Sequence, residues 1–282
     1  MRKNKKTNAL VSGITGYALI FIMGVLYILP FAWLVSSSLK TTRQLYAIPP
    51  EWIPRPPTLK NFIDGWAVLP FGMYLRNTLF VAVTGAAGTV ISSAFVAYGF
   101  ARFKCRANPV LFILVISTMM LPNQVTLVPL YQVFSRLRWL DTYLPLLVPR
   151  FLGTGAFFIF LLRQFFKTIP HELDEAAKID GCNTLRVLVS ILAPLCRPAL
   201  ITVFVLSLVN GWNDFMSQLI YLNSERNYTI AIGLQFFSSK YGPQQVNLLL
   251  AVSLLTLLPL LALFFIAQRY FVQGISTTGI KG

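Results

Sequence analysis

Four long stretches of this sequence contain no Asp, Glu, Lys or Arg, and they constrain the fold more than any other feature. They are residues 7–39, 77–101, 107–135 and 241–268. Because about 20 mostly apolar residues cross a bilayer as a helix, each stretch predicts one spanning helix. Residues 142–162 and 198–224 add two candidates with one charge each, Arg150 and Asp214. The sequence therefore predicts an all-α integral membrane protein with six transmembrane helices.

Composition supports a membrane protein, since 56% of the residues are hydrophobic, 12% are charged and the mean hydropathy is +0.66. The net charge of +15 lies at loop ends without a basic stripe, so it predicts membrane anchoring and no nucleic-acid partner. We expect one transmembrane domain over residues 1–282, with an uncleaved first span and a polar loop at 163–197. The expected spans are about 11–38, 77–101, 109–133, 143–162, 198–222 and 246–268.

The distribution of basic residues predicts the orientation of the chain. With both termini cytoplasmic, the inner segments hold 14 Lys and Arg in 62 residues, against 9 in 61 residues outside. Basic residues favour the cytoplasmic side, so the 163–197 loop is expected there. The three cysteines then lie in or beside cytoplasmic segments, and without a CxxC pair they are expected to be reduced, structural thiols.

Between spans one and two, five prolines between Pro49 and Pro57 favour extended backbone. This loop is either a docking surface for an extracytoplasmic partner or a rigid connector. The small residues of span two, such as Gly85 and Gly88, predict close helix packing. In span three, Pro122 and Pro129 interrupt the helix beside Asn123 and Gln124, a pattern typical of a pathway lining but also of ordinary kinks.

Span five contains an intramembrane carboxylate, Asp214, near Asn210, Trp212 and Asn213. Such a group is a functional candidate because burying it in lipid costs free energy. Trp212 either stacks on a sugar ring or anchors the helix at the interface. Arg150 either pairs with Asp214 or extends toward the outer surface, and we favour the second.

The segment "TIPHELDEAAKIDGCNTLRVLVSILAPLCRP", residues 168–198, carries local start and stop signals. Thr168 is expected to cap a helix whose first turn contains Pro170, and Gly181 is expected to end it. Asn183 should cap a second helix that runs to Pro194. The first helix has a narrow face of small and apolar residues, which fits either a docking surface or a solvated helix. That face is Leu173, Ala176, Ala177 and Asp180. A metal site at His171 is not expected, because no His or Cys partner lies nearby.

"EAAKIDGCNTLRVLVSILAP" resembles the EAA signature of permease subunits in ATP-binding-cassette (ABC) importers, and nearly the whole chain resembles the carbohydrate branch, maltose-type (MalG-like). "GWNDF" and the closing "VQGISTTGIKG" carry the weaker part of this resemblance. Two positions depart from the pattern, Ala193 in place of Leu and Cys182 in place of Ala. The matched signature residues are Glu175, Ala176, Ala177, Gly181, Ile191 and Pro194.

The resemblance implies the type I ABC importer permease fold and a cytoplasmic coupling helix, about Pro170 to Asp180, that docks on an ATP-hydrolysing subunit. The implied coupling residues are Glu172, Glu175, Ala176, Ala177, Asp180, Gly181, Ile191 and Pro194. A tail that contacts the ATPase would include Gly274, Gly279, Lys281 and Gly282. The implied substrate pathway or gate includes Asn123, Gln124, Asn210, Trp212, Asn213 and Asp214.

The implied partners are a second, MalF-like permease subunit, an ATPase dimer, an extracytoplasmic solute-binding protein, membrane lipid and a sugar substrate. No nucleotide-binding P-loop occurs in the sequence, so the chain is expected to bind no cofactor and to be no enzyme, while the partner ATPase uses ATP and Mg. A multi-pass location in the cell membrane of a prokaryote follows.

Other interpretations stay open at this point. A glycerol-phosphate or polyol substrate fits the same permease pattern, and the pathway residues serve only as a gate if the partner permease builds the pocket. Asp214 and Arg150 in the membrane are compatible with an ion-coupled secondary transporter. A non-transporting membrane scaffold is the third possibility.

Overall fold

The computed structural model describes the backbone of residues 2–276 and the side chains of residues 15–268, apart from Asn123 and Pro243. Within this range the chain is helical, with connecting turns and no strand. Four helical spans are long and apolar enough to cross a membrane, and up to six if each of two bent helix pairs is one span. The prediction of an all-helical chain with about six spans is therefore confirmed.

The two bent pairs lie where the sequence places prolines or a polar break. In the third predicted span, the helices meet at 101° around Leu121 and Pro122, whereas Pro129 lies inside a helix. Just before the predicted fifth span, a bend of 85° separates Thr184–Leu195, which lies in the predicted polar loop, from Arg197–Asn213. This helix ends at Asn213, before the predicted end at 222, so Asp214 lies at the helix end and not within it.

The helices group into two compact units, each described by itself. Unit 1 comprises the chain up to Pro70 together with Leu234–Leu257. It contains α1 (Arg2–Ser38), α2 (Thr42–Leu45), α3 (Lys60–Val68), most of α14 (Ile230–Tyr241), the 3-10 turn Gly242–Gln245 and the beginning of α15 (Val246–Ser276).

A buried amide network holds unit 1 together. Asn61 donates hydrogen bonds to the carbonyl oxygens of Ser38 and Lys40, at 2.8 and 2.7 Å, and accepts one from Asn247 at 2.9 Å. These bonds connect the end of α1, α3 and the start of α15, whose polar groups are buried there. Gly65 of α3 lies so close to α15 that a Cβ atom would be 2.9 Å from Val252.

Unit 2 comprises Phe71–Gly233 and the remainder of α15 from Leu258. Its helices are α4 (Phe71–Arg102), α5 (Asn108–Ser117), α6 (Asn123–Arg136), α7 (Leu144–Phe151), α8 (Ala156–Thr168), α9 (Glu172–Ile179), α10 (Thr184–Val187), α11 (Ala193–Leu195), α12 (Arg197–Asn213) and α13 (Met216–Tyr221). Two 3-10 turns, Thr118–Met120 and Glu225–Asn227, and a π-helical turn, Leu188–Leu192, complete the unit.

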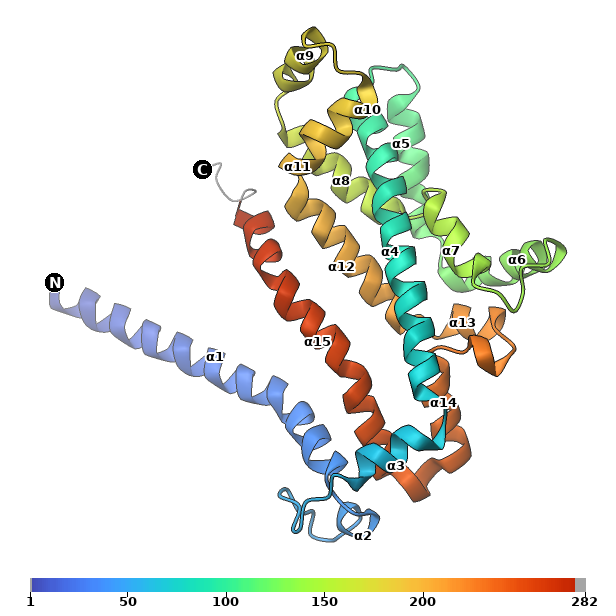
Figure 1. Cartoon of the computed structure of the whole chain (residues 1–282). Helices are drawn as coiled ribbons and strands as arrows, with labels where there is room; N and C mark the ends of the chain where they lie inside the picture. The colour runs from blue at the N-terminus through green and yellow to red at the C-terminus, as the bar shows by residue number, and fades with distance from the viewer. Residues whose placement is uncertain (1, 277–282) are drawn as a thin grey trace. The chain divides into compact units, whose positions relative to one another are not determined.

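The long helix α4 lies centrally in unit 2, beside α12, α7 and α8 (Figure 1). Its small residues permit this close packing, as the sequence predicts. Gly88 is buried against α7, and a Cβ atom there would lie 2.5 Å from the Phe151 ring.

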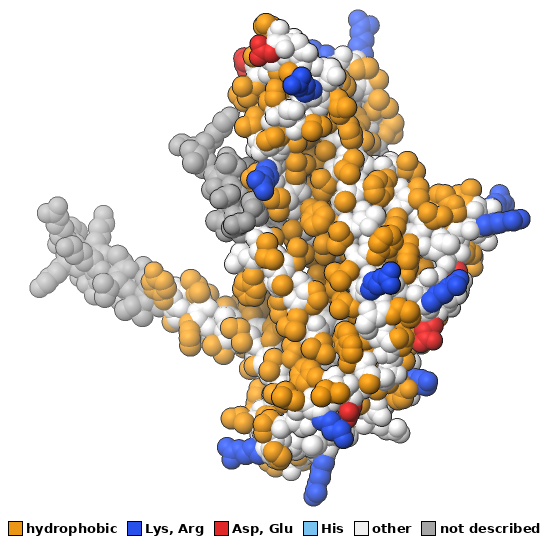
Figure 2. Space-filling view, in the orientation of Figure 1, with side chains coloured by type: hydrophobic (Ala, Val, Ile, Leu, Met, Phe, Trp, Pro, Cys, Tyr) orange, Lys and Arg blue, Asp and Glu red, His pale blue; other side chains and the backbone are white. Residues whose placement is uncertain are grey.

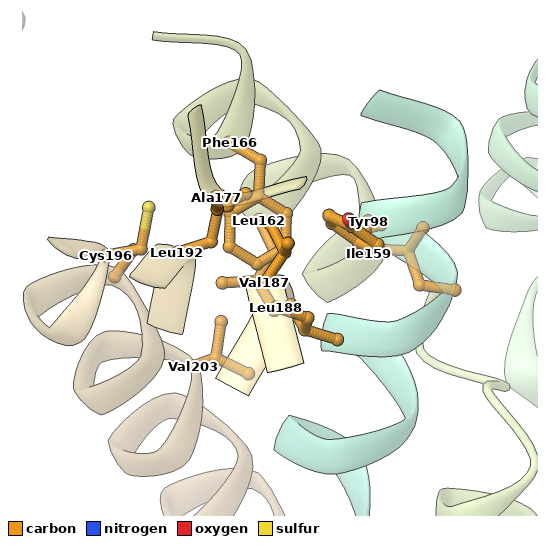
Figure 3. Packing of buried hydrophobic residues seen from close by; sticks show 12 residues of the cluster. Tyr98, Ile159, Leu162, Phe166, Ala177, Val187, Leu188, Leu192, Cys196 and Val203 are labelled. Atoms are coloured by element: carbon orange, nitrogen blue, oxygen red, sulfur yellow. The ribbon is translucent and has the colours of Figure 1, made fainter. Parts of the chain in front are cut away.

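A hydrophobic cluster joins α9 and the helices that follow it to α4 and α8 (Figure 3). Phe166, Val187 and Leu192 are fully buried in it, and Ala177 of α9 is 5% exposed. Burying one large apolar side chain of this cluster away from water stabilises the folded state by about 1.5–3 kcal/mol. The short α9 is therefore fixed to the body of unit 2 and is not a free loop.

Hydrophobic side chains also cover much of the visible surface of unit 2, while a group of acidic side chains lies at its α9 end (Figure 2). Exposed apolar residues along α4 and α5, such as Phe80, Phe95 and Ile113, are 49–65% exposed. A surface of this kind suits contact with lipid or with other membrane helices.

Candidate functional site

The local signals around α9 are confirmed at its end and corrected at its start. Thr168 does not cap α9, because it is the last residue of α8, where its hydroxyl donates to the carbonyl of Phe165. Pro170 precedes the helix, and His171 occupies the N-cap position without a side-chain hydrogen bond. Three carboxylates nevertheless lie in the first turn, where they favour the positive end of the helix dipole.

Gly181 ends α9 with a backbone φ of +80°, a left-handed conformation that favours glycine. The N–H of Cys182 donates to the carbonyl of Ala177 at 2.9 Å, which closes the helix end. Asn183 then caps the next helix, since its Oδ1 accepts from the N–H of Arg186 at 2.8 Å. The glycine that ends α9 and the asparagine that caps the next helix are both as predicted.

One side of α9 is anchored by a buried ion pair that the sequence interpretation missed. Nε of Arg102, at the end of α4, lies 3.0 Å from Oδ2 of Asp174, and their side chains are only 3% and 7% exposed. Arg102 also donates to the carbonyl of Ile169 at 3.1 Å, just before α9. Charge and burial together tie α9 to the end of α4.

The opposite side of α9 is open. Ile179 is 87% exposed and Leu173 is 42% exposed. Of the predicted docking face, Leu173, Ala176 and Asp180 are exposed, but Ala177 is wrong for that face because it packs into the hydrophobic cluster. The two other carboxylates among the implied coupling residues, Glu172 and Glu175, are exposed as well.

The last two signature positions lie beyond α9 and differ in their surroundings. Ile191 lies in the π-helical turn and packs against the hydrophobic cluster, while Pro194 is exposed in α11. Ala193, which departs from the family pattern, is partly buried within the same helical segment and leaves the helix intact up to Leu195. The bend of 85° follows directly after it, at Cys196.

A cavity of about 370 Å³ lies within unit 2, lined by residues of α4, α6, α7, α8, α12 and α13 and the adjoining turns. Its polar lining includes Thr89, Arg150, Ser207, Asn210 and Asp214. The predicted pathway residues Asn210 and Asp214 therefore lie together at one cavity. A volume of this size is within the range of about 300–1,000 Å³ that small-molecule sites occupy.

Trp212, Asn213 and Gln124 are not among the described residues that line this cavity. Trp212 is 5% exposed and packs against α4 in a separate apolar cluster with Ala82 and Ala86. Asn213 and Gln124 are exposed, and the Asn123 side chain is outside the described residues. Of the predicted tail, Gly274 belongs to α15, whereas Gly279, Lys281 and Gly282 are beyond the described range.

Arg150 does not extend to the outer surface, so that expectation is wrong. Its side chain runs between two glycines, Gly85 of α4 and Gly211 of α12, and lines the cavity. A Cβ atom would lie 2.8 Å from its Cδ at Gly85 and 3.0 Å from its Nη1 at Gly211. The pattern of one arginine in an otherwise apolar span was the available signal for this role.

Among the described residues, no group of three or more His, Cys, Asp or Glu side chains is placed to hold a metal ion. Cys105 is exposed, Cys182 is partly buried and Cys196 is buried, and all three are free thiols. The candidate site consists of two parts of unit 2, which are the exposed surface of α9 and the cavity lined by Arg150 and Asp214.

Comparison with known proteins assigns a family to this arrangement. Residues 90–277 match the family of binding-protein-dependent transport system inner membrane components. The arabinooligosaccharides transport system permease protein AraQ of Halalkalibacterium halodurans is 30% identical over 283 residues, which cover 99% of each chain. The sn-glycerol-3-phosphate transport system permease protein UgpE of Yersinia enterocolitica is 34% identical over 263 residues, 90% of this chain and 92% of UgpE.

A solved structure shares the fold. It is a chain of a bacterial ABC transporter involved in the import of the acidic polysaccharide alginate, with a TM-score of 0.81 and 21% identity. The match covers 93% of this chain and 96% of that chain. The chain therefore belongs to the family of binding-protein-dependent transport system inner membrane components, as a multi-pass cell-membrane permease of an ABC transporter with the type I importer fold.

Proposed function

We propose that this chain is one of two permease subunits of an ATP-driven importer for a sugar or oligosaccharide, of the maltose type. It forms half of the translocation pathway and works with a second permease subunit, an ATPase dimer and an extracytoplasmic solute-binding protein. The chain breaks no covalent bond itself, because ATP and Mg are used by the partner ATPase. The observation that carries the coupling role is α9, anchored on one side by Arg102 and open on the other.

The open side of α9 has the chemistry of a helix that docks in a groove. Burying Ile179 in a partner would gain about 1.5–3 kcal/mol, and the acidic first turn offers charge for basic residues of that partner. Because the ion pair and the cluster connect α9 to α4 and α8, a displacement of α9 moves these helices with it. The contact between the tail from Gly274 and the ATPase is proposed from the family resemblance alone.

ATP binding would favour an outward-open state that receives the substrate, and hydrolysis would return the pathway to an inward-facing state. The cavity around Asn210 and Asp214, with its partly polar lining, supports a place for the substrate on this pathway. The exposed Asn213 and Gln124, together with Asn123, remain candidates for a gate. Trp212 serves best as a packing residue between α12 and α4.

Sugar import is supported by AraQ, whose name gives arabino-oligosaccharides as its cargo. A glycerol phosphate is the runner-up, since UgpE is named for sn-glycerol 3-phosphate. Asp214 in the cavity would repel an anion of this kind, whereas Arg150 in the same cavity would attract it.

The proposed coupling is tested in proteoliposomes that contain the full complex with its binding protein. Gly181→Val strains the left-handed turn, and Glu175→Lys reverses a charge on the open side of α9. We expect sugar-stimulated ATP hydrolysis and uptake to fall about tenfold, since 1.4 kcal/mol of docking energy is equivalent to that factor.

Asp64→Lys is the matched control, because it reverses an exposed carboxylate in α3 of unit 1, outside the proline-rich loop, and should leave stimulated ATP hydrolysis at the wild-type level. Unchanged coupling in both α9 variants would rule out α9 as the docking element.

Ion-coupled secondary transport is the second candidate, favoured by two opposite charges at a membrane cavity. In this case the chain alone would accumulate sugar under a proton or sodium gradient. Proteoliposomes without the ATPase measure this directly. We expect no uptake there and full uptake when the ATPase and ATP are added.

A further inference from the structure

The cavity of unit 2 contains one cation and one anion that are not bonded to each other. Arg150 and Asp214 both line it, yet no charged nitrogen of Arg150 lies within the 4.0 Å of an ion pair from a carboxylate oxygen of Asp214. Both residues belong to the described chain. Two opposite charges in a membrane protein usually neutralise each other by contact, so their separation here requires a reason.

The position of Arg150 is built into the packing of α4 and α12. Gly85 and Gly211 leave the space through which its side chain reaches the cavity. In the described part of the chain, its one side-chain hydrogen bond runs from Nη1 to the carbonyl oxygen of Ser207 at a long 3.4 Å. A guanidinium group carries several N–H donors in a planar fork, so most of its donors are left for another acceptor.

The carboxylate of Asp214 is only partly satisfied. Oδ1 accepts a hydrogen bond from the N–H of Ser217 at 3.1 Å, and this bond fixes the carboxylate at the turn between α12 and α13. Oδ2 has no hydrogen bond within the described chain, and the residue is partly exposed to the cavity. The cavity therefore offers free acceptor capacity at Asp214 and free donor capacity at Arg150.

The remaining lining matches a ligand with apolar ring faces and polar edges. Asn210 supplies an amide group, and Phe158 and Tyr221 supply aromatic surface. The hydroxyls of Ser207 and Thr89 are used within the protein, since Ser207 donates to Thr89 and Thr89 donates to the carbonyl of Gly85. A hydroxyl group both donates and accepts, so neighbouring hydroxyls on one ring can donate to a carboxylate and accept from a guanidinium. An anion would satisfy Arg150 but would be repelled by Asp214.

We propose that Arg150 and Asp214 form a ligand subsite for a neutral polyhydroxylated ring, which bridges the two charges inside this subunit. This inference rests on the proposed function and adds to it that this subunit contacts the substrate itself and selects neutral sugars over anionic ones. Low local polarity strengthens both hydrogen bonds, so the bridging ring replaces the missing ion pair.

The test is equilibrium binding to the complete permease and ATPase complex in lipid nanodiscs, without the solute-binding protein. The probes are tritiated arabinotriose, which is neutral, and glycerol 3-phosphate, which is anionic. We expect the wild-type complex to bind arabinotriose and to bind glycerol 3-phosphate more weakly. Asp214→Asn and Arg150→Lys should each weaken arabinotriose binding about tenfold, since a hydrogen bond to a charged group is lost or misplaced.

Asp64→Asn is the matched control, because it removes an exposed carboxylate from α3 of unit 1 and should leave the affinity unchanged. Stronger binding of glycerol 3-phosphate than of arabinotriose, no binding of arabinotriose to the wild type, or wild-type affinity in both cavity variants would each overturn the proposal.

A second measurement needs no variant. Permethylated arabinotriose keeps the ring framework but cannot donate hydrogen bonds, so it should fail to displace tritiated arabinotriose from the wild-type complex. Equal displacement by the permethylated probe would overturn the subsite. If ATP-driven arabinotriose uptake persists in that case, the importer function stands and only the subsite fails; if no sugar is taken up with ATP, the importer function itself fails.

Discussion

Unit 2 contains two arginine and aspartate combinations that its packing treats in opposite ways. Arg102 and Asp174 are in contact at 3.0 Å, almost fully buried, and connect α4 to α9. Arg150 and Asp214 line one cavity without contact, and each keeps unused hydrogen-bonding capacity. The comparison teaches that the first combination fixes one helix on another, whereas the second preserves space for a third group.

Removing one partner of the contacting pair should have the largest effect. Asp174→Ala leaves Arg102 buried without a counter-charge, which costs about 3–5 kcal/mol. Unfolding in increasing SDS, followed by tryptophan fluorescence, measures this loss. Arg102→Met combined with Asp174→Leu should recover most of it, because no buried charge remains. If the stability lost by the double variant equals the sum of the losses in the two single variants, Arg102→Met and Asp174→Leu, the two residues are not energetically coupled.

A third aspartate sharpens the comparison, because neutral donors and no arginine satisfy it. Asp141, between α6 and α7, accepts from the Ser224 hydroxyl and from the N–H groups of Asn223 and Ser224 at 3.0 and 2.8 Å. The Ser224 hydroxyl first, and then these N–H groups, hold the pKa of Asp141 well below its usual 3.8. Asp141→Asn should cost about 2–3 kcal/mol at pH 7.

The pH dependence of this contribution has a definite sign. The folded pKa is depressed, so the stabilisation is complete above pH 3.8 and is lost as the pH falls below it and the unfolded chain takes up a proton first. The difference in melting temperature between wild type and Asp141→Asn should therefore shrink as the pH falls below about 4. A constant difference from pH 7 to pH 3 would contradict this assignment.

Closing the space around the separated pair should have an intermediate effect. Gly85→Ala places a Cβ atom 2.8 Å from the Cδ of Arg150 and should cost about 1–3 kcal/mol, together with displacement of the guanidinium group. Sugar uptake by the full complex should fall with it. Gly72→Ala in the same helix is the control, because nothing lies within 4 Å of its Cβ position. Equal activity of the two variants would show that the Arg150 position is not set by Gly85.

The smallest expected effect concerns the cap behind α9. Asn183→Ala removes the 2.8 Å hydrogen bond to the N–H of Arg186 and should cost about 1 kcal/mol. Asn183→Ser should restore most of the stability, because a serine hydroxyl caps a helix nearly as well. A larger loss, comparable to that of Asp174→Ala, would place Asn183 within the anchoring of α9 itself.

Signals that act within a few residues were predictable. Gly181 and Asn183 are read correctly because a left-handed turn and a helix cap depend only on their own neighbours. Thr168 fails as a cap because α8 continues through it, and the continuing helix uses its hydroxyl for a carbonyl in the preceding turn. Competition between two adjoining helices decided that position.

Long-range pairing was not predictable in the same way. Asp174 is one of four carboxylates in its segment, and nothing in the local sequence distinguishes it from Glu172 or Glu175. Only the folded chain brings Arg102, at the end of α4, into contact with Asp174. The polarity of Asn210 and Asp214 did identify the cavity, whereas Trp212 lies on another side of α12 and packs against α4. Arg150 was misplaced because the space for it is created by glycines on two other helices.

Cys196 gives the anchored end of unit 2 a built-in reporter. It lies at the bend between α11 and α12, buried in the cluster that includes Ala177 of α9, while Cys105 is exposed. A maleimide therefore reacts with Cys196 only when the cluster opens, so its labelling rate measures how often this end of the molecule loosens. Comparing that rate with and without ATP in the assembled complex would show whether α9 moves as part of a rigid body or separates from the helices behind it.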